Sequence, residues 1–192
     1  MKSSKLMLIG TALTLNVISQ PYALAINTIT FNGSITDATC DVSLEYKGVE
    51  AGTNGSGTIA LDEVSKSSLA SADSSAGQVP FFIVAKNCSL GTPAKSKIAA
   101  NFKSVNSDNQ GNLNNIAASG GATNVQLRIL DSGRTAIKIN DPNQSTTTSF
   151  TDINTDALGE TKIPYFVEYY SSLGTATSGA VSSTVDYEMM YK

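Results

Sequence analysis

The chemistry open to this chain is limited first by the residues that it lacks. Its 192 residues include no histidine, so the Ser-His and Cys-His pairs of nucleophilic catalysis and the histidine ligands of metal centres cannot be built. The acidic residues do not follow the dense spacing of a calcium loop, and residues 52–57 (GTNGSG) lack the Lys-Ser/Thr of a phosphate-binding loop. We therefore expect no enzyme, no metal site and no cofactor, and we interpret residues 52–57 as a hairpin turn.

The first 25 residues have the pattern of an export signal. Two lysines, Lys2 and Lys5, precede an uncharged apolar run over residues 6–18, and Ala23-Leu24-Ala25 forms a small-x-small cleavage site. We predict cleavage after Ala25, with a cut after Ser19 as the alternative. The formal net charge of −3 and the lack of a basic patch argue against a nucleic-acid partner.

Two cysteines, Cys40 and Cys88, remain as the pair that could react with each other. An exported chain meets an oxidising compartment, where such a pair is oxidised. We therefore predict a disulfide bond between them; two buried free thiols are the alternative.

Short apolar alternations separated by turn-rich segments recur along the rest of the chain, which is the pattern of an all-β protein. Their number and spacing predict one immunoglobulin-like β-sandwich, with a closed barrel as the alternative. Only residues 61–72 could form a helix, and we expect at most a short one. The predicted strands cover residues 29–31, 42–44, 58–61, 81–84, 98–102, 125–130, 136–139, 163–170 and 181–191.

The last predicted strand places its apolar residues on one side. The side chains of Val181, Val185, Tyr187, Met189 and Tyr191 share one face, because side chains alternate along a strand. The strand ends one residue before Lys192, so no further strand follows it in the sequence. We expect this strand to be half-buried and the sandwich to lack its next strand.

The segment that follows the predicted signal peptide alternates in the same way. Ile29, Phe31, Gly33 and Ile35 share one face of a strand, and the polar residues between them share the other. Glycine in a strand often marks a place where another backbone comes close. The apolar face therefore needs a partner that leaves little room over Gly33.

These features together resemble the pilin subunits of the chaperone-usher pathway of Gram-negative bacteria, in particular type 1 and F17-like major fimbrial subunits. The resemblance covers essentially the whole chain after the signal peptide. It rests on residues 29–35 (ITFNGSI) leading into Cys40, on Cys88 after the strand 80–84, on residues 124–131 (NVQLRILD), on Gly179, which has 13 residues after it, and on the penultimate Tyr191.

The resemblance implies an incomplete immunoglobulin-like sandwich, at residues 38–192, that is completed by a donor strand from another subunit. Residues 26–37 would be the donor extension, with Ile29, Phe31, Gly33 and Ile35 entering a neighbour's groove. One wall of that groove would carry Gly179, Val185, Tyr187, Met189 and Tyr191, and a periplasmic chaperone would hold this wall and the carboxylate of Lys192 before assembly. The implied partners are neighbouring pilin subunits, the chaperone, an outer-membrane usher and a tip adhesin.

The resemblance thus predicts a structural subunit, most simply the major shaft subunit, of an extracellular fimbrium that is exported through the periplasm and supports adhesion. A minor or adaptor pilin and a tip-associated adhesin that binds a carbohydrate are the alternatives within the same system. Outside it, the alternative is a self-contained secreted β-sandwich, in which residues 29–35 form an ordinary first strand.

Overall fold

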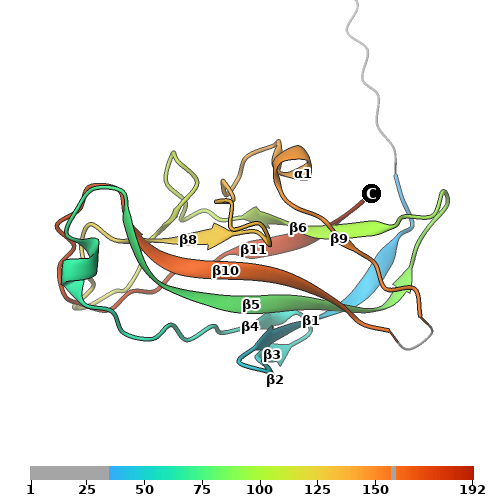
Figure 1. Cartoon of the computed structure of the whole chain (residues 1–192), viewed down its shortest axis with the longest axis horizontal. Coiled ribbons are helices and arrows are strands. Elements are labelled where there is room, and N and C mark those ends of the chain that lie inside the picture. The colour runs from blue at the N-terminus through green and yellow to red at the C-terminus, as the bar shows by residue number, and fades with distance from the viewer. Residues whose placement is uncertain (1–34, 157–158) are drawn as a thin grey trace, which may run out of the picture. The chain divides into compact units, whose positions relative to one another are not determined.

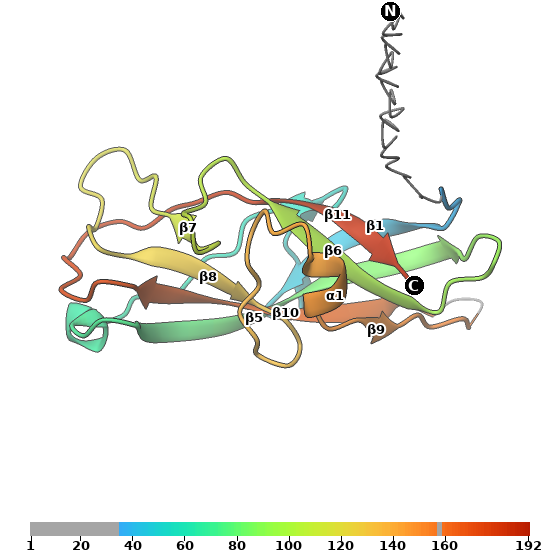
Figure 2. The same cartoon turned by 90° about the horizontal axis from the view of Figure 1, so that it is seen from above.

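The computed structural model describes residues 35–156 and 159–192, and the residues from Ile35 onward form one compact unit. This unit contains two main antiparallel sheets and a small hairpin (Figures 1 and 2). Within the described residues, neither of the short helices has the length or the apolar character needed to cross a membrane.

The larger sheet has six strands in the order β2-β1-β5-β10-β8-β7. Its centre is the pair β5 and β10, which run antiparallel with Ile163 opposite Ile83. The strand bounds are β1 (Thr39–Tyr46), β2 (Val49–Glu50), β5 (Ser74–Ser89), β10 (Thr161–Ser171), β8 (Gln126–Leu130) and β7 (Leu113–Asn114).

The smaller sheet has three strands in the order β11-β6-β9. Its central strand β6 (Lys97–Lys103) pairs with β11 (Asp186–Tyr191) along its length and with β9 (Thr151–Asp152) only at its first residues. A separate hairpin is made of β3 (Gly52–Thr53) and β4 (Ser56–Gly57). A 3-10 helix, η1 (Lys66–Leu69), and one turn of α-helix, α1 (Gln144–Thr147), complete the secondary structure of the described residues.

The core lies between the inner faces of the two sheets. Tyr165 of β10 is fully buried and makes an edge-to-face contact with Phe102 of β6, with ring centroids 5.0 Å apart. The Tyr165 hydroxyl accepts a hydrogen bond from the backbone N–H of Ala100 at 2.7 Å. This bond satisfies a polar group at the centre of an apolar core, where an unpaired donor would be costly.

Two buried polar side chains hold loops against the sandwich. Gln144 of α1 is 1% exposed, and its amide accepts from the Phe102 N–H and donates to the Phe102 carbonyl, both at 2.8 Å. It thereby supplies the hydrogen bonds that a neighbouring strand would give to this part of β6. Asp131 after β8 accepts from the N–H groups of Gly133, Thr135 and Ser149 and from the Ser149 hydroxyl.

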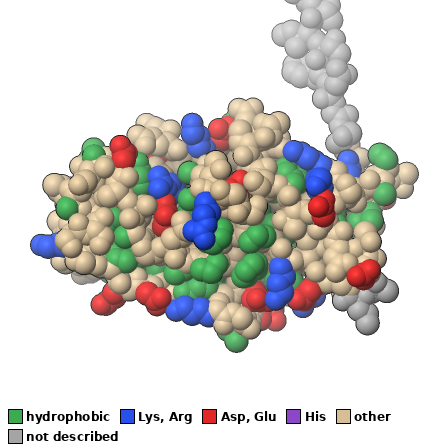
Figure 3. Space-filling model, in the orientation of Figure 1, with side chains coloured by type: hydrophobic (Ala, Val, Ile, Leu, Met, Phe, Trp, Pro, Cys, Tyr) green, Lys and Arg blue, Asp and Glu red, His purple; other side chains and the backbone are tan. Residues whose placement is uncertain are grey.

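The outer face of the larger sheet is partly apolar. Phe82 of β5 and Phe166 of β10 are half-buried there, and the Arg134 guanidinium lies 4.5 Å from the centre of the Phe166 ring. Figure 3 shows hydrophobic side chains across the middle of one face of the molecule, with basic side chains among them.

The predicted all-β sandwich is confirmed, but three predicted strands differ from the structure. Residues 58–61 and 181–185 keep the predicted alternation of exposure without belonging to a β-ladder, so the last strand begins at Asp186 rather than at Val181. Residues 136–139 are not a strand, because Ile137 and Ile139 bury their side chains from a loop. The region 61–72 contains only η1, as expected, whereas α1 was not predicted.

Candidate assembly interface

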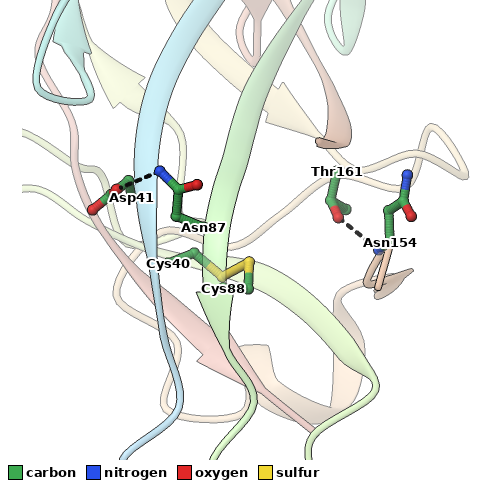
Figure 4. The surroundings of a disulfide bond; sticks show 6 residues. All are labelled: Cys40, Asp41, Asn87, Cys88, Asn154 and Thr161. Atoms are coloured by element: carbon green, nitrogen blue, oxygen red, sulfur yellow. Dashed lines mark hydrogen bonds between the residues drawn. A yellow bond between two sulfur atoms is a disulfide. The ribbon is translucent and has the colours of Figure 1, made fainter. Parts of the chain in front are cut away.

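The predicted disulfide bond between Cys40 and Cys88 is present in the structure. It joins the start of β1 to the end of β5, with the two Cα atoms 4.1 Å apart (Figure 4). Next to it, the Asn87 side-chain amide donates to the Asp41 carboxylate at 3.0 Å. The disulfide bond thus fixes the position at which the chain enters the sandwich after residues 35–38.

The strand β11 has one free edge among the residues that the structure describes. It pairs with β6 from Asp186 opposite Lys103 to Tyr191 opposite Ile98, and no described strand pairs with its other side. Residues 181–191 alternate between half-buried odd positions and exposed even positions up to residue 189. An edge strand of this kind presents unpaired backbone N–H and C=O groups beside an apolar row.

The segment 58–64 comes close to the residues that precede β11, because Val64 and Val181 line the same cavity. Its apolar residues Ile59, Leu61 and Val64 are half-buried, and the side chains between them are exposed. The Tyr46 hydroxyl donates to the Ala60 carbonyl at 2.5 Å and fixes this segment beside the end of β1. An extended segment with this alternation but without a ladder has the side chains of a strand and lacks the backbone partner.

Half-buried apolar side chains from β1, from the segment 58–64 and from residues 181–191 make up what we call the open-edge strip. Its members all pack on the buried core and are themselves only half-buried. They are Cys40, Val42, Ile59, Leu61, Val64, Val181, Val185, Tyr187, Met189 and Tyr191.

The two sides of the open-edge strip approach each other at its ends. At one end, Tyr191 and Cys40 are close: burial raises the pKa of Tyr191, and the Cys40 backbone has a smaller, opposite effect. At the other end, a cavity of about 280 Å³ is lined by Val64 from one side and Val181 from the other, with Leu69 and Tyr169 contributing. The strip thus runs from the disulfide bond to a cavity near η1 that both apolar and polar side chains line.

Gly179 lies at the cavity end of the strip, before β11. A Cβ atom at this position would come within 2.5 Å of the backbone N of Ala122 and the backbone O of Gly120. The chain passes this closely because Ala180 exchanges backbone hydrogen bonds with Gly120 and Ala122, both at 2.9 Å. Glycine is therefore required here for close backbone approach.

The outward face of β11 is charged and well paired. The Glu188 carboxylate accepts from the Lys103 ammonium at 2.6 Å and from the Asn101 amide at 2.9 Å, and these two hydrogen bonds hold its pKa below the usual value. On the inward face, burial raises the pKa of Tyr187. The two faces of the strand therefore differ sharply in polarity.

The structure brings some of the predicted site residues together, and others lie outside the residues that it describes. Tyr187, Met189 and Tyr191 lie together in β11, and Val185 and Gly179 precede the strand. The predicted donor residues Ile29, Phe31 and Gly33 lie outside the described residues, and Ile35, the first described residue, is fully exposed. Lys192 is exposed, and its backbone oxygen accepts hydrogen bonds from the N–H groups of Ser96 and Lys97.

Two residues that the sequence pattern did not single out as partners, Gly55 and Tyr187, connect the β3–β4 hairpin to β11 in the middle of the strip. The Tyr187 hydroxyl donates to the Gly55 carbonyl at 2.7 Å, so the tip of the β3–β4 hairpin reaches β11. The available signal was the pair Asn54-Gly55, which is typical of a tight hairpin turn. This pair predicts the turn, but it does not predict that the turn contacts β11.

A two-sheet sandwich with an open-edge strip where its last strand should be is an incomplete immunoglobulin-like sandwich, the fold of pilin subunits. The sequence comparisons agree: the model of the Fimbrial family (fimbrial protein) matches residues 29–192. The chain belongs to this family.

It is 36% identical over 169 residues to the major fimbrial subunit SMF-1 of Stenotrophomonas maltophilia, covering 85% of this chain and 91% of that protein. It is 38% identical over 172 residues to the F17 fimbrial protein of Escherichia coli, covering 85% and 86%.

Solved structures support the same fold. A chaperone-usher pilus structure matches with a TM-score of 0.55 and 20% identity, over 87% of this chain and 96% of that one. The P pilus rod subunit PapA matches with a TM-score of 0.51 and 20% identity, over 71% and 93%. The chain is therefore a fimbrial subunit with the fold of the chaperone-usher pilins, a structural rather than an enzymatic family.

Proposed function

We propose that this chain is the major shaft subunit of a fimbrium and that it polymerises by donor-strand exchange. The observation that carries the proposal is the open-edge strip, because its two sides have the alternation of strands and its described residues supply no strand between them. A strand inserted there would pair with the free edge of β11 and cover the strip. Backbone hydrogen bonds would give affinity, and alternate side chains would give register.

The occupant that we propose is residues 26–37 of a second copy. Ile29, Phe31 and Ile35 alternate as the strip requires, and a strand of residues 29–35 spans about 20 Å, close to the length of β11. The exposed Ile35 begins the described unit, so the extension starts at the surface. Gly33 would lie where the acceptor leaves no room for a side chain.

Such a contact joins different surfaces of two copies, so repeated contacts form an open fibre rather than a closed ring. Residues 1–25 would be removed during export, residues 26–37 would donate and residues 38–192 would accept. A periplasmic chaperone would cover Val185, Tyr187, Met189 and Tyr191 and bind the terminus at Lys192 before assembly at the usher. The fibre on the bacterial surface would carry a tip adhesin and support adhesion.

The role of major subunit is supported by the two relatives described above, one of which is named as a major fimbrial subunit. A minor subunit is the second candidate, because the minor fimbrial subunit HifD of Haemophilus influenzae is 29% identical over 185 residues. Sheared fibres separate the two roles: a shaft subunit dominates the protein gel, and cells that lack the chain lose their fibres. Normal fibres on such cells would contradict the major role.

A donor peptide tests the strand exchange directly. A chain that begins at Thr36 keeps the hydrogen bond from the Thr92 N–H to the Asp37 carboxylate and lacks the proposed donor. We expect it to be unstable alone and to gain a much higher melting temperature with a peptide of residues 26–37, but not with the same peptide carrying Phe31→Asp. Cooperative melting at one temperature with and without peptide would show that the sandwich is complete in itself.

A further inference from the structure

The β3–β4 hairpin lies across the open-edge strip rather than beside it. Gly55 at its tip is buried, and an added Cβ there would come within 2.9 Å of Val42 Cγ2 and 2.7 Å of the Tyr187 hydroxyl. Val42 belongs to β1 of the larger sheet, and Tyr187 belongs to β11 of the smaller sheet. The tip therefore touches β11, with which the donor strand is proposed to pair, and also β1 of the facing sheet.

The hairpin combines a tight turn at its tip with small residues at its base. Asn54 and Gly55 have φ values of 49° and 75°, the left-handed pair of a two-residue hairpin turn. The base is the glycine pair Gly52 and Gly57, and the flanking chain is fixed to β1 by the hydrogen bond from the Ala51 N–H to the Leu44 carbonyl at 2.8 Å. Small residues between a rigid tip and a fixed base are suited to act as a hinge.

A single hydrogen bond holds the tip to β11. Among the described residues, the Tyr187 hydroxyl is the one group outside the hairpin that donates to or accepts from residues 53–56. A donor strand that pairs with β11 must run about 4.8 Å from it, and its inward side chains must pass the Tyr187 ring. The hairpin tip lies at the hydroxyl end of the same ring, so an inward side chain of the donor strand would compete with the tip for this place.

We propose that the β3–β4 hairpin is a clasp that closes the open-edge strip of the unassembled subunit at Tyr187 and swings out when a donor strand inserts. The clasp rests on the donor-strand function proposed above. While closed, it covers the middle of the strip and lowers the exposure of apolar surface and unpaired edge before assembly. Its opening is a step that precedes full insertion, so the strength of the Tyr187–Gly55 contact sets the rate of assembly.

The test compares two tyrosine variants of the chain of residues 26–192. Tyr187→Phe removes the clasp bond and keeps the ring, and Tyr170→Phe is the matched control, because the Tyr170 hydroxyl also donates one hydrogen bond, to the Asp73 carboxylate, and neither Tyr170 nor Asp73 belongs to the open-edge strip. We measure amide hydrogen exchange of residues 52–57 in the unassembled chain and the rate of polymer formation by size-exclusion chromatography. Loss of one hydrogen bond predicts a rise of about 2- to 12-fold in both for Tyr187→Phe. The control variant should assemble at the wild-type rate.

A second variant weakens the contact from the other side. Gly55→Ala places a methyl group against Val42 and the Tyr187 hydroxyl, and it should also raise exchange and assembly rates. The clasp is refuted if Tyr187→Phe leaves the exchange of residues 52–57 unchanged, or if the hairpin opens and assembly is no faster. Failure of all three chains to polymerise would instead overturn the donor-strand function, and the clasp with it.

Discussion

Replacement of Gln144 by alanine tests how the smaller sheet is supported beneath the open-edge strip. The Gln144 amide makes two hydrogen bonds of 2.8 Å to the backbone of Phe102, and both residues are about 1% exposed. The variant leaves the buried Phe102 N–H without a partner, at a cost of about 1–3 kcal/mol, whereas the Phe102 C=O still accepts from the Asn140 N–H at 3.2 Å. We expect a loss of about 2 kcal/mol of unfolding free energy.

The assay is urea unfolding of the unassembled chain. With a urea dependence of about 2 kcal/mol per M, the midpoint should fall by about 1 M. The matched control is Gln110→Ala, because Gln110 is exposed and should cost less than about 0.5 kcal/mol. Equal midpoints for the two variants would refute the view that the Gln144 amide acts as a ladder partner of β6.

Three further predictions concern charge, covalent closure and assembly. Burial raises the pKa of Asp131 and its four hydrogen bonds lower it, with a net pKa below 3.8, so its contribution to stability is present above about pH 4 and is lost as the pH falls through the folded-state pKa. Asp131→Asn should therefore lower stability at pH 7 and flatten the acid decline between pH 6 and 2, as measured by unfolding at each pH. Replacing Cys40 and Cys88 by serine opens a closed loop with a sequence separation of 48 and should cost roughly 4 kcal/mol in urea unfolding; a loss below about 1 kcal/mol would contradict this. Met189→Asp should abolish polymer formation on size-exclusion chromatography, whereas Glu188→Gln on the outward face should leave it intact, and equal assembly of the two would place the acceptor elsewhere.

The sequence predicts the parts of the fold that follow from alternation within one chain. Residues 81–84 and 163–170 alternate or are continuously apolar, and they became the central strands β5 and β10. The hairpin at residues 52–57 followed from its glycines and Asn54. Residues 136–139 were misassigned because Ile137 and Ile139 alternate for burial from a loop, which periodicity cannot distinguish from a strand.

The hydrogen bonds of Gln144 and Tyr187 to distant backbone groups could not be predicted from the sequence, for a different reason. Gln144 acts on Phe102, 42 positions earlier, and Tyr187 acts on Gly55, 132 positions earlier. A polar residue in a loop gives no sign of a distant backbone partner, because its type is equally common on exposed surfaces. Those partners became visible only once the two sheets were placed face to face.

The two remaining errors of strand prediction share one cause, and it concerns assembly rather than folding. Residues 58–61 and 181–185 have strand-like alternation, half-buried apolar side chains and no described ladder partner. Alternation reports which side chains face a core, whereas a ladder needs a second backbone at about 4.8 Å. If that backbone belongs to another subunit, both segments should become strands when a donor inserts. The amides of residues 59–61 and 183–185 have no hydrogen-bond acceptor among the described residues and should become protected from hydrogen exchange only in the polymer. Protection of these six amides in the unassembled chain would mean that the two segments find their backbone partner within one molecule and that the sandwich lacks no strand.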